Sequence, residues 1–398
     1  MIHSLLSPVK ILPMAETDSA ALADMLLFLT GISDRPVRVA VVRDTWPMSA
    51  RDEFVTALGT TGAEVFEFTD VQPNPRAADI DRMAASAELG RCDVVIGIGG
   101  GSALDSAKAL AMLAKNGGSL GDYLGSEATR KISQKGLPLV LVPTTAGTGS
   151  EVTKVGVYTA DSGRKYTLGS PFLLADAAIL CGRLTASMPP GLTAATGFDA
   201  LDHAFESLWN KNATAITKAA ARSAAVAVLR TLDGAYDASL RSDNPFPGDA
   251  EIRQQMLEAS CMAGIAFGIT GTAAGHALSF VLSEEWHVPH GAACAFTIED
   301  IYSFALGDPA NVYELALVAR LFFPDESGEL ELCGRLLGKI RDMKKRMKLP
   351  TTFTELGAAV AAGDIPRYFD RAFTDPKMLN QLPPASPEVL YPYLEAKT

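Results

Sequence analysis

The sequence predicts an α/β N-terminal domain with a mainly parallel sheet, followed by an all-α C-terminal domain. Two observations support this division. Before Leu192, short apolar runs alternate with helical stretches, a pattern typical of βαβ units. After Leu192, long Ala- and Leu-rich stretches carry helical periodicity and contain no convincing strand. We therefore expect one domain over residues 1–190 and a second over residues 191–398.

Five apolar runs in the first half read as strands, because they are short, β-branched and bounded by turn residues. They are residues 37–42, 64–68, 93–98, 138–143 and 155–158. In the second half we expect helices over residues 192–209, 214–236, 250–267, 313–323 and 330–347. The stretch 242–248 contains Pro245, Pro247 and Gly248 and is expected to be a loop, because Pro and Gly break both helices and strands.

Composition agrees with a large soluble globular protein and argues against several other classes. The chain has 398 residues, of which 48% are hydrophobic and 20% charged, enough for a sizeable core. A net charge of −11 argues against nucleic acid and anionic membrane partners. The five cysteines form no CxxC pair, which is typical of a reduced, cytoplasmic protein. Neither a signal-peptide pattern nor an apolar run of about 20 residues occurs in the sequence.

A glycine-rich turn follows the strand predicted at 93–98. Gly99, Gly100 and Gly101 precede Ser102, where a helical stretch begins. Glycines let the backbone approach a ligand, and a helix N-terminus offers free N–H groups to a phosphate. The spacing is not GxGxxG, and such a turn also occurs merely for tight packing. The hydroxyl-rich segment 143–153 gives independent support for a dinucleotide-binding role, because it also runs from an apolar strand into a small, polar turn.

A second constellation consists of Asp199, His203, His276 and His290. Asp199 and His203 are four residues apart, so one helix would present both on the same face. One carboxylate and three imidazoles suit Fe²⁺ or Zn²⁺ and leave a position for substrate. Three of the chain's five histidines fall in this set. The alternative is that Asp199 and His203 are an ordinary polar pair on an amphipathic helix.

Together these motifs resemble the iron-dependent (group III) alcohol dehydrogenase family. The matching segments are Gly99–Lys108, Pro143–Thr153, Met188–Gly197 and the Asp/His₃ set. The resemblance extends from about Asp44 to the C-terminal segment 384–396, so most of the chain is covered. The resemblance implies NAD(H) as cofactor and a divalent metal, with Fe²⁺ favoured and Zn²⁺ as the alternative. It implies hydride transfer between NAD(H) and an aldehyde–alcohol pair. The cofactor-binding residues it implies are Asp44, Asn74, Gly99, Gly100, Gly101, Ser102, Asp105, Thr144, Thr145, Thr148 and Ser150.

Asp44 closely follows the strand predicted at 37–42, and its carboxylate bears on which nicotinamide cofactor is bound. A carboxylate there repels a 2′-phosphate and can accept hydrogen bonds from free ribose hydroxyls, so we expect NAD(H) rather than NADP(H). The alternatives are that Asp44 is only a turn residue and that Arg43 assists a phosphate. Arg76 stands where the family commonly has a small hydroxyl residue, which weakens the match around Asn74.

The segment 276–291 is similar to family branches that act on small aldehydes with an anionic tail, such as sulfoacetaldehyde reductases and 4-hydroxybutyrate dehydrogenases. Lys154 is the leading candidate to hold a sulfo-, phosphono- or carboxy-group, with Arg164 and Lys165 as alternatives; each is also readable as a surface charge. Phe280 stands where the family often has a further histidine. His287 is then a candidate for that histidine's catalytic role, or equally a helix-end or turn residue.

Three other functions are weighed on the sequence alone. They are a general short-chain alcohol dehydrogenase, a lyase resembling dehydroquinate synthase, and a non-catalytic NAD-binding or filament-forming protein. The presence of all four candidate metal ligands argues against loss of catalysis. Apolar Leu278, Phe280 and Trp286 argue against the polar pocket that such a lyase needs. We expect a small-molecule substrate and a homodimer or higher homo-oligomer.

Overall fold

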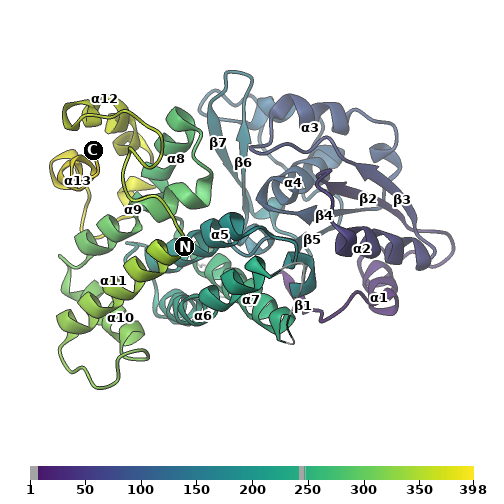
Figure 1. Ribbon diagram of the computed structural model, residues 1–398. Helices are drawn as coiled ribbons and strands as arrows, with labels where there is room; N and C mark the ends of the chain where they lie inside the picture. The colour runs from purple at the N-terminus through teal and green to yellow at the C-terminus, as the bar shows by residue number, and fades with distance from the viewer. Residues whose placement is uncertain (1–7, 242–245, 247) are drawn as a thin grey trace. The chain divides into compact units, whose positions relative to one another are not determined.

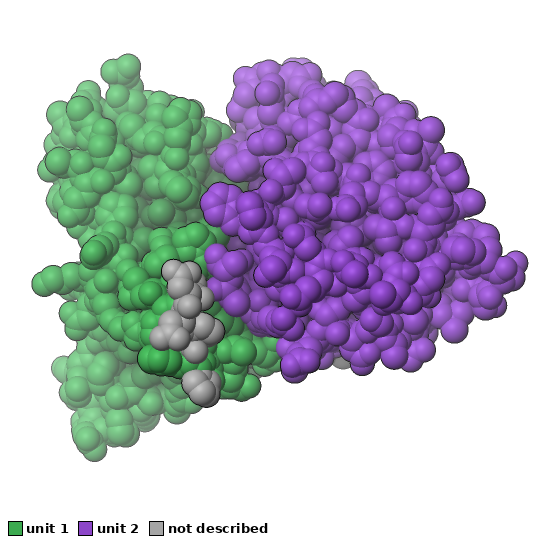
Figure 2. All heavy atoms as spheres, turned by 45° about the vertical axis from the view of Figure 1, so that its right-hand side comes forward, with its two compact units in different colours: residues 1, 146–148, 188–398 green, residues 2–145, 149–187 purple. Residues whose placement is uncertain are grey.

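The computed structural model describes residues 8–241, 246 and 248–398 (Figure 1). The chain divides into two compact units, coloured separately in Figure 2. The sheet unit contains residues up to Thr145 and Gly149–Ser187, and the helical unit contains Ala146–Thr148 and Met188–Thr398. Of the loop expected at 242–248, residues 242–245 and 247 lie outside the described residues.

The sheet unit is built on a six-stranded parallel sheet with strand order β1-β8-β5-β4-β2-β3. Four strands confirm sequence predictions, and β1 and β8 were not predicted. The strands are β1 (Lys10–Pro13), β2 (Arg38–Arg43), β3 (Glu64–Phe68), β4 (Val94–Gly99), β5 (Leu139–Pro143) and β8 (Ala177–Leu180). Every residue of β4 and β5 is buried, as expected for central strands covered on both faces.

The strand predicted at 155–158 exists, but it does not belong to the parallel sheet. It is β6 (Val155–Thr159), which pairs antiparallel with β7 (Lys165–Gly169) in a separate two-stranded sheet. Burial along β6 alternates between half-buried and buried residues, which is typical of a ribbon with one face on the protein. The apolar run was therefore correctly assigned as a strand and wrongly assigned to its sheet.

Helices cover both faces of the parallel sheet. Side chains of α1 (Ser19–Thr30) and α2 (Ser49–Thr60) share a core with Val94, Ile96 and Ile98 of β4. On the opposite face, α4 (Gly101–Asn116) packs against β4, and α3 (Ala77–Ala84) packs against α4. A Cβ atom at Gly97 would lie 2.6 Å from Ala107 Cβ, so glycine allows this close helix–strand contact.

The helical unit surrounds α5 (Pro190–Leu208), which is buried from Thr193 through Leu208 and contacts α6, α7 and α9. Within the described part of this unit no strand is formed, as predicted. The helix expected at 313–323 begins four residues earlier, because the Asp308 side chain caps its N-terminus. The other helices are α6 (Ala215–Leu240), α7 (Asp249–Thr270), α8 (Ala274–Trp286), α9 (His290–Ala305), α10 (Pro309–Ala319), α11 (Glu329–Arg346), α12 (Ile365–Phe369) and α13 (Pro387–Glu395).

No single helix in the described ranges is long and apolar enough to cross a membrane. Within the same ranges, the pair α7 and α8 passes that test by length and composition, but the two helices are bent by 104° at the break between them.

Candidate active site

Helix α5 presents Asp199 and His203 one turn apart. Pro190 occupies the first helical position, where its missing N–H costs nothing, and the helix continues through the core of the unit. Asp199 is 2% and His203 4% exposed. A polar pair buried this deeply needs partners, and it finds them on two further helices.

Helices α8 and α9 supply those partners from their first turns. His276 lies in the first turn of α8, and His290 is the first residue of α9. Glycines adjoin both histidines: a Cβ at Gly275 would lie 2.9 Å from an Asp202 carboxylate oxygen. A Cβ at Gly291 would lie 2.3 Å from the carbonyl oxygen of Ala195. Glycine at these positions therefore lets α8 and α9 approach α5 closely.

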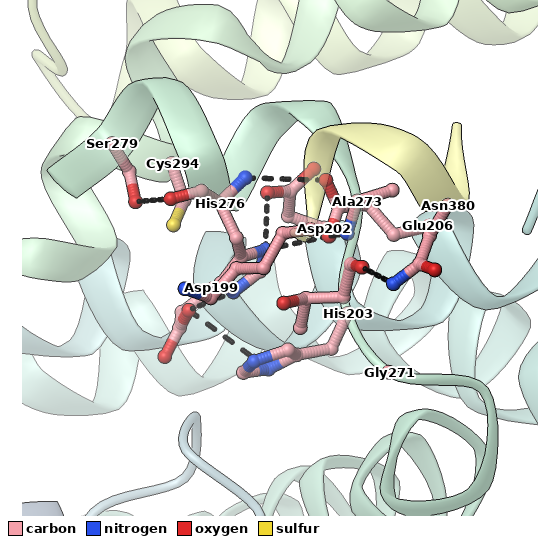
Figure 3. Close-up of polar contacts among 12 residues, drawn as sticks. Asp199, Asp202, His203, Glu206, Gly271, Ala273, His276, Ser279, Cys294 and Asn380 are labelled. Carbon is pink, nitrogen blue, oxygen red and sulfur yellow. Dashed lines mark hydrogen bonds and ion pairs between the residues drawn. The ribbon is translucent and has the colours of Figure 1, made fainter. Parts of the chain in front are cut away.

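Imidazole nitrogens of all three histidines surround one oxygen of Asp199 (Figure 3 shows Asp199, His203 and His276). The Oδ1 atom lies 3.5 Å from His276 Nε2, 3.6 Å from His290 Nε2 and 3.9 Å from His203 Nδ1. Ligands arranged tetrahedrally at about 2.0–2.2 Å from an ion lie roughly 3.3–3.6 Å apart. Among the described residues, Asp199 Oδ1 and His276 Nε2 are buried without a hydrogen-bond partner. The donor set therefore fits a divalent metal.

His203 fits this arrangement less closely than the other predicted ligands. Its Nδ1 atom also lies 3.3 Å from the carbonyl oxygen of Gly147, and its ring stacks on Phe267 with centroids 3.9 Å apart. The donor atoms that lie within 4.8 Å of one another belong to Asp199, His276, His290 and Cys294. The structure thus brings three of the four predicted ligands into one group and places His203 at its margin.

Cys294 is a member of this group that the sequence reasoning missed. It lies one turn after His290 on α9, and its Sγ atom is 3.8 Å from His290 Nε2. Burial raises the pKa of the Cys294 thiol to about 12. The i, i+4 spacing from His290 was the available signal, because it places both side chains on the same helix face.

Two acids from α5, also missed, lie behind His276. Glu206 accepts a hydrogen bond from His276 Nδ1 at 2.8 Å and another from the Ala273 N–H at 2.6 Å (Figure 3). Asp202 Oδ2 is 3.3 Å from the same Nδ1. The hydrogen bond from His276 Nδ1 to Glu206 orients the imidazole ring so that Nε2 is directed at Asp199. Such a carboxylate is common behind metal-binding histidines.

Burial and the neighbouring charges set the protonation of these groups in the metal-free chain. Burial would raise the pKa of Asp199, but His203, His290 and His276 lower it. Burial, and then the Glu206 carboxylate, raise the pKa of Asp202 to about 7. Burial lowers the pKa of His203 to about 3, which keeps its imidazole neutral. Asp199 is thus a carboxylate and His203 a neutral imidazole at neutral pH, the forms in which both bind metals.

In the sheet unit, the predicted glycine turn joins β4 to α4. The N-cap residue Gly100 makes no side-chain cap, and the first turn of α4 contains no acidic residue. This N-terminus therefore suits a pyrophosphate. Asp44 follows β2 and lies beside the turn, because a Cβ at Gly99 would be 3.2 Å from its Oδ2 atom. Asp44 Oδ1 accepts a hydrogen bond at 2.7 Å from Arg51, which is 1% exposed.

Other predicted cofactor residues gather at the same turn. The Asn74 N–H donates to Ser102 Oγ at 3.2 Å, and Asn74 has a left-handed backbone with φ of 58°. The Thr144 N–H donates to the Gly99 carbonyl at 2.9 Å. A Cβ at Gly100 would lie 3.3 Å from the Thr145 methyl group. The structure therefore brings these residues together around the start of α4.

Asp105 and Ser150, two further predicted cofactor residues, form hydrogen bonds with other groups of the protein. Asp105 accepts hydrogen bonds from Ser150 Oγ at 2.7 Å and from the Val157 N–H at 2.9 Å. The buried Lys108 donates to Ser150 Oγ at 2.7 Å. These contacts fix the turn that follows β5, and direct contact of Asp105 or Ser150 with a cofactor stays a prediction. Thr148 belongs to the helical unit with residues 146–148.

The two predicted catalytic residues lie in exposed positions. His287 is the C-cap of α8, with a left-handed backbone at φ of 54°, and its imidazole is not part of the donor group. This placement agrees with the helix-end alternative, and a catalytic role stays a prediction. Lys154 is exposed just before β6 in the sheet unit.

A cation that the sequence reasoning missed lies near the metal donors. The Lys377 ammonium sits 4.0 Å from the centre of the Phe280 ring, and that ring is 5.9 Å from the His290 ring. Lys377 also pairs with Asp375 at 3.1 Å. Lys377 is far from Phe280 along the chain, so no sequence pattern could predict that the two side chains meet.

One unit is a parallel α/β sheet with a glycine turn suited to a dinucleotide, and the other is helical and contains a buried carboxylate–histidine donor group. This combination is typical of enzymes that use a nucleotide cofactor together with a metal ion. Residues 21–181 match the family "Iron-containing alcohol dehydrogenase", and residues 193–395 match "Fe-containing alcohol dehydrogenase family, C-terminal". The chain belongs to the iron-containing alcohol dehydrogenase family and is an oxidoreductase. This family membership argues against the lyase alternative.

Individual relatives agree in family and differ in substrate. The chain is 34% identical to a sulfoacetaldehyde reductase of Bilophila wadsworthia, over 83% of each chain. It is 40% identical to long-chain-alcohol dehydrogenase 1 of Geobacillus thermodenitrificans over 64% of this chain, but the match spans only 62% of that enzyme. Among solved structures, a 1,3-propanediol oxidoreductase matches with a TM-score of 0.87 and 27% identity over both full chains. A sulfoacetaldehyde reductase from Bifidobacterium kashiwanohense in complex with NAD⁺ matches with a TM-score of 0.84 and 28% identity, over 100% of this chain and 99% of that one.

Proposed function

We propose that this protein is a metal-dependent, NAD(H)-dependent alcohol dehydrogenase that interconverts a short aldehyde and its alcohol. The observation that carries the proposal is the convergence of buried donor atoms on Asp199 Oδ1, where His276 Nε2 has no hydrogen-bond partner among the described residues. Asp199, His276 and His290 would hold Fe²⁺, or alternatively Zn²⁺, with His203 or Cys294 as the further donor. When bound, the ion supplies Lewis-acid polarisation of the substrate oxygen.

The chain's own residues orient the site and control access to it. Asp199, His203 and His276 have side chains no more than 5% exposed, whereas the His290 side chain is 36% exposed. Substrate therefore reaches the donors from the side of His290, and Phe280 forms an apolar wall beside it. The first turn of α4 would bind the cofactor pyrophosphate, and Asp44 would accept hydrogen bonds from the ribose.

Metal binding is tested with a pair of neighbouring histidines. His290→Ala should lose both tight metal retention and turnover, because it removes a donor. His287→Ala is the matched control and should keep the metal, since His287 is outside the donor group. Metal content is measured by mass spectrometry after gel filtration. A His290→Ala protein that retains a full complement of metal contradicts the proposed ligand set.

We further propose that the preferred aldehyde carries an anionic tail, namely a sulfonate, phosphonate or carboxylate. The similarity to a sulfoacetaldehyde reductase supports this, and so does the position of Lys377 across Phe280 from His290. A charge-assisted hydrogen bond contributes about 1.5–3 kcal/mol, and Asp375 competes for the same ammonium. We therefore expect a preference for anionic over neutral aldehydes of about tenfold, at the lower end of that range.

The test compares sulfoacetaldehyde, phosphonoacetaldehyde and succinic semialdehyde with propanal and butanal. Lys377→Gln should remove the preference in kcat/KM, and Asp375→Asn should increase it by freeing the ammonium. Lys154→Gln tests the cation expected from the sequence in the same way. Equal efficiency of the wild type with neutral aldehydes contradicts the anion preference and leaves a general short-chain alcohol dehydrogenase.

A homodimer or higher homo-oligomer stays our expectation for the assembly. Light scattering coupled to gel filtration measures the mass in solution, and a monomer would contradict the expectation.

A further inference from the structure

The thiol of Cys294 lies among the metal donors of the described chain. Three other buried cysteines, Cys92, Cys181 and Cys333, each have Sγ within 4.0 Å of a main-chain carbonyl oxygen. The contact of Cys294 Sγ is instead His290 Nε2, at 3.8 Å. Cys294 is fully buried. Its thiol therefore lies within contact distance of a candidate metal ligand.

We propose that Cys294 is a ligand of the metal, so that the site binds its ion through carboxylate, imidazole and thiolate donors. This inference rests on the proposed metal site and adds a soft donor to it. Three observations carry it. The donor atoms of Asp199, His276, His290 and Cys294 all lie within 4.8 Å of one another. Asp199 and His276 are buried, and within the described residues Asp199 Oδ1 and His276 Nε2 have no hydrogen-bond partner.

The spacing of the sulfur agrees with direct coordination. A zinc-type ion bonds sulfur at about 2.3 Å and nitrogen at about 2.0–2.1 Å, which places tetrahedral S and N ligands roughly 3.6 Å apart. The observed 3.8 Å between Cys294 Sγ and His290 Nε2 is close to that value. His203 Nδ1 lies farther from the Asp199 oxygen than either of the other imidazole nitrogens and contacts the Gly147 carbonyl. Cys294 Sγ, which lies within 4.8 Å of the Asp199, His276 and His290 donor atoms, is thus placed to supply a further donor beside or instead of His203.

Coordination has a simple chemical balance. The S–H bond is replaced by a sulfur–metal bond, and one proton leaves to solvent. A thiolate favours Zn²⁺, Co²⁺ and Cd²⁺, whereas carboxylate and water favour Mn²⁺ and Mg²⁺. The presence of Cys294 would therefore move the metal preference of this chain toward softer ions.

The experiment uses Co²⁺ as a spectroscopic probe. The full-length protein is stripped with a chelator, loaded with Co²⁺ under anaerobic conditions, and its bound cobalt is counted. The wild type should show a thiolate-to-cobalt charge-transfer band in the near ultraviolet. Cys294→Ser and Cys294→Ala should lose the band while still binding cobalt, and Cys333→Ser, which removes a buried thiol elsewhere in the same unit, should keep it.

Metal competition gives a second readout that does not depend on activity. Cys294→Ser should lower the ratio of Cd²⁺ to Mn²⁺ affinity by at least about tenfold, because serine replaces the soft donor by a hard one. Stoichiometric cobalt without a charge-transfer band in the wild type, or a band that persists in Cys294→Ser, overturns the role of Cys294 alone. A wild-type chain that binds no cobalt overturns the proposed metal site and the role of Cys294 together.

Discussion

The contact between Glu206 and His276 allows a sharp prediction about metal affinity. Glu206 is fully buried, and its Oε2 atom accepts hydrogen bonds from His276 Nδ1 at 2.8 Å and the Ala273 N–H at 2.6 Å. Its Oε1 atom accepts from the His276 main-chain N–H at 3.2 Å. All these neighbours are donors, so the NH₂ group of a glutamine would face one of them.

Glu206→Gln therefore removes the negative charge behind His276 and at least one accepted hydrogen bond. A hydrogen bond to a charged group contributes about 1.5–3 kcal/mol, which corresponds to a loss of roughly 10- to 100-fold in metal affinity. The dissociation constant is measured by competition with a chromogenic chelator, with circular dichroism to check that the variant is folded.

Asp202→Asn is the matched control on the same helix. Asp202 also approaches His276 Nδ1, at 3.3 Å, but among the described residues neither of its oxygens makes a hydrogen bond. Burial and the nearby Glu206 raise its pKa to about 7, so asparagine resembles its protonated form. We expect Asp202→Asn to weaken metal binding less than about tenfold. Wild-type affinity in Glu206→Gln, or an equal loss in both variants, would refute the reasoning.

Two further predictions concern the cofactor and the fold. Asp44→Asn removes a repulsion of about 1–2 kcal/mol toward a 2′-phosphate, while the asparagine oxygen can still accept the hydrogen bond from buried Arg51. The ratio of kcat/KM with NADPH to kcat/KM with NADH should therefore rise about tenfold. An unchanged ratio would contradict the role of Asp44. Glu299→Gln should destabilise the fold by about 3–5 kcal/mol at pH 7, because it leaves the fully buried Lys344 ammonium, 2.7 Å away, unpaired. Burial opposes ionisation of Glu299, but Lys344 outweighs it and lowers the pKa of Glu299. The ion pair therefore stabilises the fold fully above the unfolded-state pKa of about 4.3. This stabilisation is lost as the pH falls through the lower pKa of the folded state. The gap in Tm between variant and wild type should therefore be full at pH 7 and narrow below about pH 4, and a gap independent of pH would contradict this.

Much of the fold was predictable because local pattern and environment agree. The runs that became β4 and β5 contain no polar side chain, and β2 is apolar between its two terminal arginines, as buried parallel strands require. Strands β1 and β8 were missed because each has only four residues, too few for a periodic signal. The position of β6 depended on a partner strand, β7, whose half-exposed sequence carries little pattern.

The candidate site was predictable where its residues share one element and less so elsewhere. Asp199 and His203 follow from helical spacing alone. Glu206 repeats that helix face, but its role depends on His276, which lies 70 residues away. Lys377 approaches Phe280 only through the folding of a long C-terminal segment. Contacts of this kind depend on tertiary packing, which periodicity does not encode.

The glycines around the metal donors limit how this enzyme could be re-engineered. Gly275 and Gly291 adjoin two of the histidines, and the Gly147 carbonyl contacts the third. At each of them even a methyl group would lie within 3 Å of another residue. A library that randomises these backbone positions would mainly yield chains with displaced histidines. Variation in substrate range is better sought at Phe280, whose side chain borders the site without setting the helix spacing.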